Sequence, residues 1–174
     1  MVKNDIKVIK HPGPTRQYLA EDRTTSSVTA TIKVGEPVKV AGTGTNFVQP
    51  VATGDPEITT DQLVGLAASE STETSTADGT VNVTTLLPTR TVLRGKATTS
   101  SNMDTQSELD GLKNDWVTFD VTASSGTNGI FTIDENEGTD PDVHGLKIID
   151  GDISLYTLDV IVHSMAVEAG PYVA

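Results

Sequence analysis

The sequence predicts a mainly β protein: a small β-sandwich or β-barrel with one short helix and an extended N-terminal arm. Three observations lead to this prediction. Thr is the commonest residue and Val the next, and β-branched side chains favour strands over helices. Short apolar runs alternate with Gly, Pro, Asn and Asp at turn-marked intervals, which is typical of sandwiches and barrels. Only one stretch carries a clear helix-start signature.

The chain divides into an arm, residues 1–27, and a β-rich body, residues 28–174. The arm contains Pro12-Gly13-Pro14 and few large apolar residues, so we expect it to be extended, with little core of its own. The short run "IKVIK" within it has the pattern of an edge strand. A chain of 174 residues suits one domain with additional segments at its edge or a tail better than two domains.

The first half of the body contains five predicted strands. We expect one strand at 28–34, "VTATIKV", and a second at 38–41, with a turn at Gly35-Glu36-Pro37 between them. A third strand follows at 47–52, "FVQPVA". The run "LVGLAAS" at 63–69 is ambiguous by periodicity. A turn at Asp78-Gly79 followed by the alternating "TVNVTTLL" indicates that this run is an antiparallel strand. The Ser/Thr-rich stretch between them is then a polar hairpin arm or loop.

The second half contains the helix and five further strands. We expect strands at 89–95, 116–123 and 130–134, the last two joined by a turn at Asn128-Gly129, and two C-terminal strands split around Asp150-Gly151. Thr105 and Glu108 have the spacing of a capping box, with Leu109 and Leu112 on one side, which predicts a short helix.

The net charge of -12 is unevenly distributed. Residues 1–40 contain seven Lys or Arg and four Asp or Glu, a net charge of +3, so the remainder carries -15. An acidic body opposes binding of nucleic acid, because phosphates would be repelled. The basic arm suits an acidic partner surface. No run of about 18 apolar residues is present, and charges interrupt the N-terminus, so we expect a soluble protein without a membrane segment or signal peptide.

No motif reaches the level of an enzyme signature, so we expect no catalysis, no cofactor and no metal. Cys is absent, which excludes disulfides and thiolate chemistry. With only three His residues, few catalytic Ser-His-Asp triads are possible, and the Gly-x-Ser-x-Gly motif that carries a nucleophilic Ser is missing. We expect His144 at the surface and His163 on the strand face opposite Val160 and Val162. Hydrolysis by two carboxylates remains a third hypothesis, because Asp and Glu are numerous.

The acidic stretch at 134–142 resembles a calcium loop in its oxygen-rich composition. Gly138 and Thr139 break the expected ligand spacing, so an acidic hairpin loop is the alternative interpretation. The residues that would bind the ion are Asp134, Asn136, Asp140 and Asp142.

Residues 30–95 resemble the head decoration, or capsid cement, proteins of tailed bacteriophages. The resemblance rests on "IKVGEPVKVAG" and, further along, "LVGLAASESTETSTADGTVNVTTLLP"; the matching residues are Gly35, Glu36, Val38, Gly65, Ala67, Ala77, Asp78, Gly79, Val81 and Val83. Residues 100–174 have no counterpart. The resemblance implies a virion structural protein, located on the outer surface of the capsid, that bridges subunits of the major capsid protein, commonly as a homotrimer. It implies neither cofactor nor catalysis.

The leading hypothesis is therefore a non-enzymatic protein that stabilises a phage head. The alternative is a calcium- or carbohydrate-binding β-sandwich of a receptor-binding or adhesin protein. In the first case we expect the arm to anchor the protein on a neighbouring chain. Ordering the arm costs about 1–2 kcal/mol per residue, so apolar burial must add to weak surface ion pairs. The predicted contact residues are Lys3, Ile6, Lys7, Val8, Ile9, Lys10, Arg16, Tyr18 and Leu19. Deleting residues 1–24 should then leave the body folded.

Overall fold

The computed structural model describes residues 6–20, 32–41, 47–57, 62–72, 79–124, 127–136, 140 and 142–163. It confirms the predicted mainly β fold with one short α-helix. The elements in chain order are β1 (Lys7–Lys10), β2 (Thr15–Ala20), β3 (Pro37–Val40), β4 (Phe47–Pro50), β5 (Leu63–Ala67), β6 (Gly79–Thr85), β7 (Val92–Lys96), the 3-10 helix η1 (Ser100–Asn102), α1 (Gln106–Leu112), β8 (Trp116–Ser124), β9 (Thr127–Asp134), β10 (Leu146–Asp152) and β11 (Thr157–Val162).

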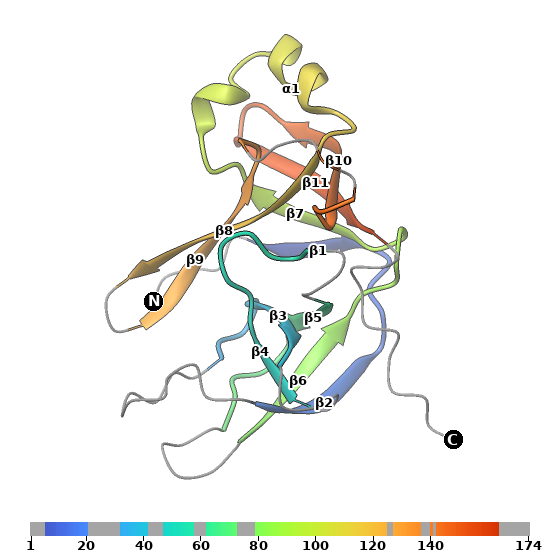
Figure 1. The fold of residues 1–174 in the computed structure, drawn as a ribbon, viewed down its shortest axis with the longest axis vertical. Helices are drawn as coiled ribbons and strands as arrows, with labels where there is room; N and C mark the ends of the chain where they lie inside the picture. Colours follow the sequence, from blue (N-terminus) through green and yellow to red (C-terminus); the bar gives the residue numbers. More distant parts are fainter. Residues whose placement is uncertain are drawn as a thin grey trace.

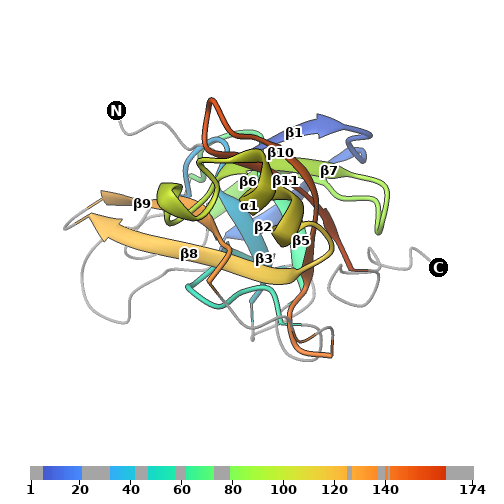
Figure 2. The same ribbon diagram turned by 90° about the horizontal axis from the view of Figure 1, so that it is seen from above.

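The strands form two sheets, one above the other in Figure 1. The lower sheet is a closed barrel in the order β2-β4-β3-β5-β6, which we call the barrel. The upper sheet has the order β1-β7-β11-β10-β8-β9. Together with α1, which Figure 2 shows from above, we call it the sheet lobe. A parallel bridge between Ala97 and Ile133 brings β9 back toward the end of β7, so this sheet curls strongly.

Two apolar clusters hold these sheets together. The smaller cluster fills the barrel and includes Tyr18, Ile32 and Val81. The larger cluster lies in the sheet lobe and extends to the barrel wall, where Leu63 and Leu66 belong to it. All five residues of β5 are buried, because one face of the strand lines the barrel and the other meets the sheet lobe. This double burial explains why the sequence of β5 does not alternate.

The N-terminal segment joins both sheets, so the prediction of an arm with little core of its own is wrong. Within residues 6–20, β1 pairs with β7 in the sheet lobe and β2 pairs with β6 and β4 in the barrel. Ile6 and Tyr18 are buried. The expected edge strand in "IKVIK" is confirmed as β1. The boundary predicted between residues 27 and 28 therefore does not separate an arm from a body.

The corner between β1 and β2 is held close to the barrel. A Cβ on Gly13 would lie 2.5 Å from the Thr85 carbonyl oxygen, so the backbones approach too closely for any larger residue. The Gly13 N–H donates to the same oxygen over 2.8 Å. The Thr91 hydroxyl donates to the His11 carbonyl over 2.6 Å. The Pro12-Gly13-Pro14 sequence thus forms a tight crossing between the sheets.

The helix and most predicted strands are confirmed, with corrections at three turns. Thr105 and Glu108 form the predicted capping box at α1. Ser124 of β8 pairs with Thr127 of β9, so Asn128-Gly129 lies inside β9 rather than in the turn. Asp150-Gly151 likewise lies inside β10. Val34 and Gly35 form a turn before β3, so residues 32–34 are not a strand, and residues 28–31 lie outside the described part.

The β10–β11 turn lies later than predicted because the strand contains an irregularity. The register shifts between Ile148 and Asp150, and the pairing then continues as far as Asp152 with Thr157. Asp152 bonds to Ser154 and fixes the turn there. Among the described residues, no helix is long and apolar enough to cross a membrane.

Candidate interaction surface

Strand β1 forms an open edge of the sheet lobe. Of the described strands, only β7 pairs with it. Lys7 and Lys10 are exposed, whereas Val8 packs against the core. Lysines at an edge discourage pairing with an identical edge, because like charges would face each other. The edge therefore favours a partner that carries carboxylates.

Cations without a carboxylate partner gather beside this edge. Elsewhere Lys33, Lys39 and Lys113 form ion pairs, and Lys147 lies over the Trp116 ring. Among the described residues, the side chains of Lys7, Lys10, Arg16, Arg90 and Lys96 make no ion pair. All except Arg16 lie on β1, on β7 or in the turn before β7. We call Lys7, Lys10, Arg90 and Lys96 the cationic edge.

Arg94, the remaining cation of β7, is paired with a carboxylate and is therefore not part of the cationic edge. Arg94 on β7 donates to both carboxylate oxygens of Asp159 on β11, over 2.6 and 2.7 Å. This hydrogen bonding raises the pKa of Arg94. Strands β1 and β7 contain no Asp or Glu. In a chain with a net charge of -12, the cationic edge is thus a local reversal of charge, which attracts acidic partners.

The structure divides the predicted contact residues into accessible and inaccessible ones. Lys7, Lys10 and Arg16 are exposed, and Leu19 is 36% exposed. Val8 and Ile9 are half-buried. Ile6 and Tyr18 are buried in the protein's own core, so they contribute to folding rather than to a contact with another chain. Lys3 lies outside the described residues.

Ile6 depends on a glycine in the neighbouring strand. A Cβ on Gly95 of β7 would lie 2.2 Å from the Ile6 Cδ1 atom and 3.1 Å from Ile133. Gly95 therefore leaves the space that Ile6 fills, and this packing holds β1 against β7. The edge that presents Lys7 is consequently anchored from its inner side.

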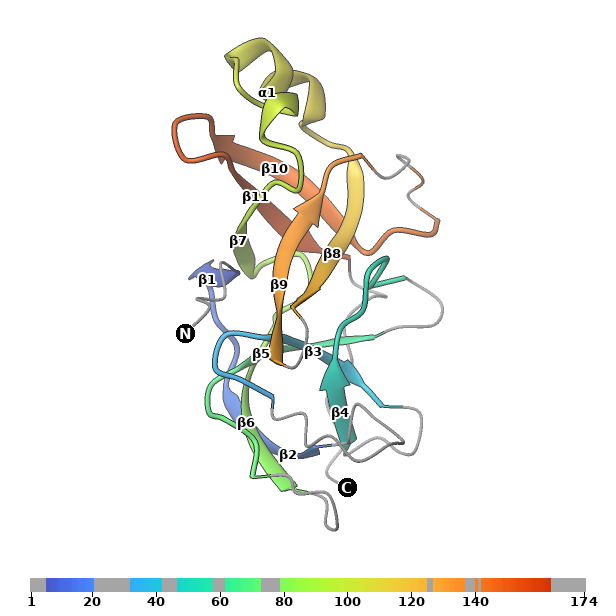
Figure 3. The same cartoon turned by 90° about the vertical axis from the view of Figure 1, so that its left-hand side faces the viewer.

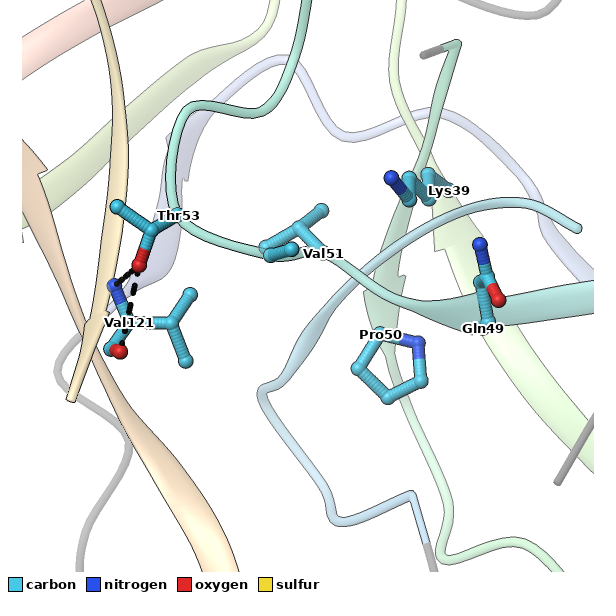
Figure 4. Close-up of a pocket in the computed structure, with 7 residues that line it drawn as sticks. Lys39, Gln49, Pro50, Val51, Thr53 and Val121 are labelled. Carbon is cyan, nitrogen blue, oxygen red and sulfur yellow. Dashed lines mark hydrogen bonds between the residues drawn. The ribbon is translucent and has the colours of Figure 1, made fainter. Parts of the chain in front are cut away.

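A shallow pocket lies between the barrel and the β8–β9 ribbon (Figure 4). It has a volume of about 570 Å³ and is lined by Lys39, Gln49, Pro50, Val51, Ala52, Thr53 and Val121. Lys39 Nζ lies 2.8 Å from an Asp55 carboxylate oxygen, and both side chains are largely buried. The Thr53 hydroxyl contacts Asp120 and the backbone of Val121. The polar groups around the pocket thus bond to the protein itself and join its two sheets.

The loop at 51–57, which lines this pocket, also forms backbone hydrogen bonds with the sheet lobe and with the segment before β10. Gly54 N–H donates to the Phe119 carbonyl over 2.9 Å, and Phe119 N–H donates to the Asp55 carbonyl over 2.6 Å. Gly145 N–H donates to the Pro56 carbonyl over 2.8 Å. We interpret the pocket as part of a structural junction.

The predicted calcium ligands form two separate turns. Asp134 accepts a hydrogen bond from the Asn136 N–H over 3.0 Å, and Asp140 accepts one from the Asp142 N–H over 2.9 Å. The Asn136 side-chain oxygen accepts from the Asn102 amide over 2.5 Å. Within the part of the chain that the structure describes, no group of three or more His, Asp or Glu is arranged to hold a metal ion.

The two C-terminal His residues have different environments. His144 is only 8% exposed, so its predicted surface position is wrong. Its burial follows from a β-bridge to Glu57, which brings the loop around it against the barrel. His163 is half-buried, with its ring edge-on to Trp116 at 5.2 Å between ring centres. Val160 and Val162 are fully buried, which agrees with their predicted position on the opposite face.

Sequence reasoning found Lys7 and Lys10 but missed Arg90 and Lys96. These residues belong to "TRTVLRGK", which has no acidic residue between two acidic regions. That local charge pattern was a usable signal. Its proximity to the N-terminal lysines depends on pairing between β1 and β7, which are remote in sequence.

No protein-family model matches this chain, and no curated protein matches its sequence.

Proposed function

We propose that this protein is a non-enzymatic structural protein of a bacteriophage virion that binds the exterior of the capsid and bridges its subunits. The cationic edge is the observation that carries the proposal. It gathers four unpaired positive side chains of an otherwise acidic protein: two on the open strand β1, one on the adjacent β7 and one in the turn before β7. An acidic subunit of the major capsid protein is the partner that this charge distribution fits.

The architecture supports a role in holding other proteins together. The N-terminal segment is tied into both sheets, and the loop at 51–57 ties them again on the other side. A force applied at β1 is therefore passed to the barrel through several hydrogen bonds. The sequence resemblance of residues 30–95 to capsid cement proteins adds to this proposal, and with it a homotrimeric assembly.

The test is co-sedimentation with phage heads that lack decoration, measured over increasing NaCl concentration. The variant Lys7→Glu/Lys10→Glu should lose most of its affinity, because it reverses two charges at the edge. Wild-type binding should weaken with salt, as exposed charges are screened within about 10 Å at 0.1 M. Circular dichroism checks that the variant remains folded.

Arg16→Glu is the matched control for the single variant Lys7→Glu, which changes the net charge by the same amount, because Arg16 is also an exposed, unpaired cation of the N-terminal segment but lies in the barrel. It should bind heads nearly as well as the wild type. Equal loss in both variants would point to the net charge rather than to the edge. Salt-independent binding, or no binding by the wild type, would contradict the proposal. Light scattering of the free protein tests the trimer.

A further inference from the structure

The turn between β10 and β11 presents two neighbouring apolar side chains to solvent. Leu155 is 56% exposed and Tyr156 is 42% exposed. Aromatic residues make up only 4% of this chain, so an exposed Tyr beside an exposed Leu is uncommon here. Tyr is also among the residue types that contribute most to binding at protein interfaces.

This turn is held rigidly from several sides. The Asp152 carboxylate accepts hydrogen bonds from the Ser154 N–H over 2.9 Å and from its hydroxyl over 2.6 Å. Leu155 N–H donates to the Asp152 carbonyl, and Ala97 N–H donates to the Tyr156 carbonyl over 3.0 Å. A rigid turn loses little conformational entropy on binding.

Tyr156 has a backbone conformation that is unfavourable for its residue type. Its φ angle is 51°, in the left-handed region, where a bulky side chain is rare and Asn or Gly is preferred. An Asn at this position would satisfy the backbone better. Strain of this kind concentrates at functional sites; His11, Thr89 and Asn114 share the left-handed region, but of these four described residues only Tyr156 combines it with an exposed large apolar side chain.

The turn is continuous with the cationic edge. Tyr156 precedes Thr157, which pairs with Lys96 of that edge, and on the same strand β7 Arg94 pairs with Lys7. Figures 2 and 3 both place the β10–β11 turn and β1 on the same side of the sheet lobe. Two nearby carboxylates are paired with cations, since Asp159 bonds to Arg94 and Asp150 lies 3.3 Å from Lys113, whereas Asp152 bonds to Ser154.

We infer that Leu155 and Tyr156 are the apolar anchor of the surface whose charged part is the cationic edge. This inference rests on the proposed function. The partner of this combined surface is an acidic capsid surface with an apolar pocket beside its carboxylates. The cations would steer and orient the protein, while the anchor would slow its dissociation.

The test compares Tyr156→Asn and Leu155→Ser with the wild type in head binding. Tyr156→Asn should keep or raise the melting temperature, because Asn tolerates the left-handed backbone, yet weaken binding by about tenfold or more, as loss of an interface anchor does. The salt dependence of binding should stay unchanged, since no charge is removed. Leu155→Ser should weaken binding in the same way.

Val34→Ser is the control, because Val34 is 57% exposed in the turn before β3 of the barrel. It should bind as the wild type does. Wild-type affinity in the Tyr156→Asn protein, or equal loss in Val34→Ser, would overturn the anchor while leaving the proposed function intact. Failure of the wild-type protein to bind heads would overturn both.

Discussion

The two strands of the N-terminal segment, β2 in the barrel and β1 in the sheet lobe, differ in how many of their edges are hydrogen-bonded. In the barrel, β2 is hydrogen-bonded on both sides, to β4 and β6, and contributes Tyr18 and Ala20 to the core. In the sheet lobe, β1 is bonded only to β7 and exposes Lys7 and Lys10. A closed barrel has no edge left to offer a partner. β2 thus stabilises the barrel from both of its edges, whereas β1 carries the exposed charged edge for which we propose a role in recognition.

The largest expected effect comes from removing one or both strands. Deleting residues 1–20 should abolish the cooperative unfolding transition, because it opens the barrel. Deleting residues 1–10 should lower the melting temperature, because Ile6 leaves a space beside Gly95, but keep the β signal. Circular dichroism during thermal unfolding measures both. A cooperative, wild-type-like transition after deletion of residues 1–20 would show that β2 is dispensable.

The next effect contrasts an ion pair in each region. Asp55→Ala removes the carboxylate that lies 2.8 Å from the largely buried Lys39 Nζ, which should lower the free energy of unfolding by about 3–5 kcal/mol. Asp159→Ala removes the partner of Arg94, whose side chain is 28% exposed. Water can then solvate the guanidinium, so the loss should be only about 1.5–3 kcal/mol, the contribution of a hydrogen bond to a charged group. Urea unfolding measures both, and an equal loss would contradict the distinction.

Two glycines sharpen the comparison further. A Cβ on Gly65 in the barrel would lie 2.1 Å from the Thr84 carbonyl oxygen, so Gly65→Ala should cost about 1–3 kcal/mol through backbone displacement. Gly111 in α1 has no atom within 4 Å of its Cβ position. Gly111→Ala should therefore stabilise the protein by about 0.5–1 kcal/mol. Thermal unfolding of both variants measures these effects. Melting temperatures that shift in the same direction in the two variants would contradict the prediction.

The smallest effect is a pH dependence in the sheet lobe. Hydrogen bonding from the Gly151 N–H and then from Lys113 lowers the pKa of Asp150. Its contribution is therefore present above the unfolded-state pKa of about 3.9 and is lost as the pH falls through the lower folded-state value. The stability difference between wild type and Asp150→Asn should shrink between pH 6 and pH 2. A constant difference in urea unfolding would contradict the shift.

Local signals predicted much of the fold, whereas remote pairings were missed. The capping box of α1, the hairpin of β8 and β9 and the pairing of β5 with β6 all depend on neighbours in sequence. The role of Ile6 could not be predicted, because its space is made by Gly95. The β10–β11 turn was misplaced, since an irregularity near Ile148 lengthens the strand.

The candidate surface was predicted in part for the same reason. Lys7 and Lys10 stand out in a short basic segment, and their exposure agrees with the prediction. Arg90 and Lys96 join them only through the pairing of β1 with β7, which no local pattern reveals. Tyr156 was missed because its left-handed backbone depends on a turn whose position was predicted incorrectly.

The Pro12-Gly13-Pro14 crossing has a consequence for the order in which the chain acquires its structure during synthesis. The strands on either side of it leave the ribosome before their partners β6 and β7, which end at Thr85 and Lys96. β2 cannot pair with β6 until Thr85 has been made, and β1 cannot pair with β7 until Lys96 has been made. Non-local pairing of this kind slows folding and leaves early segments exposed to wrong partners. Lys7 and Lys10 then keep nascent chains from pairing with one another through β1 before β7 arrives.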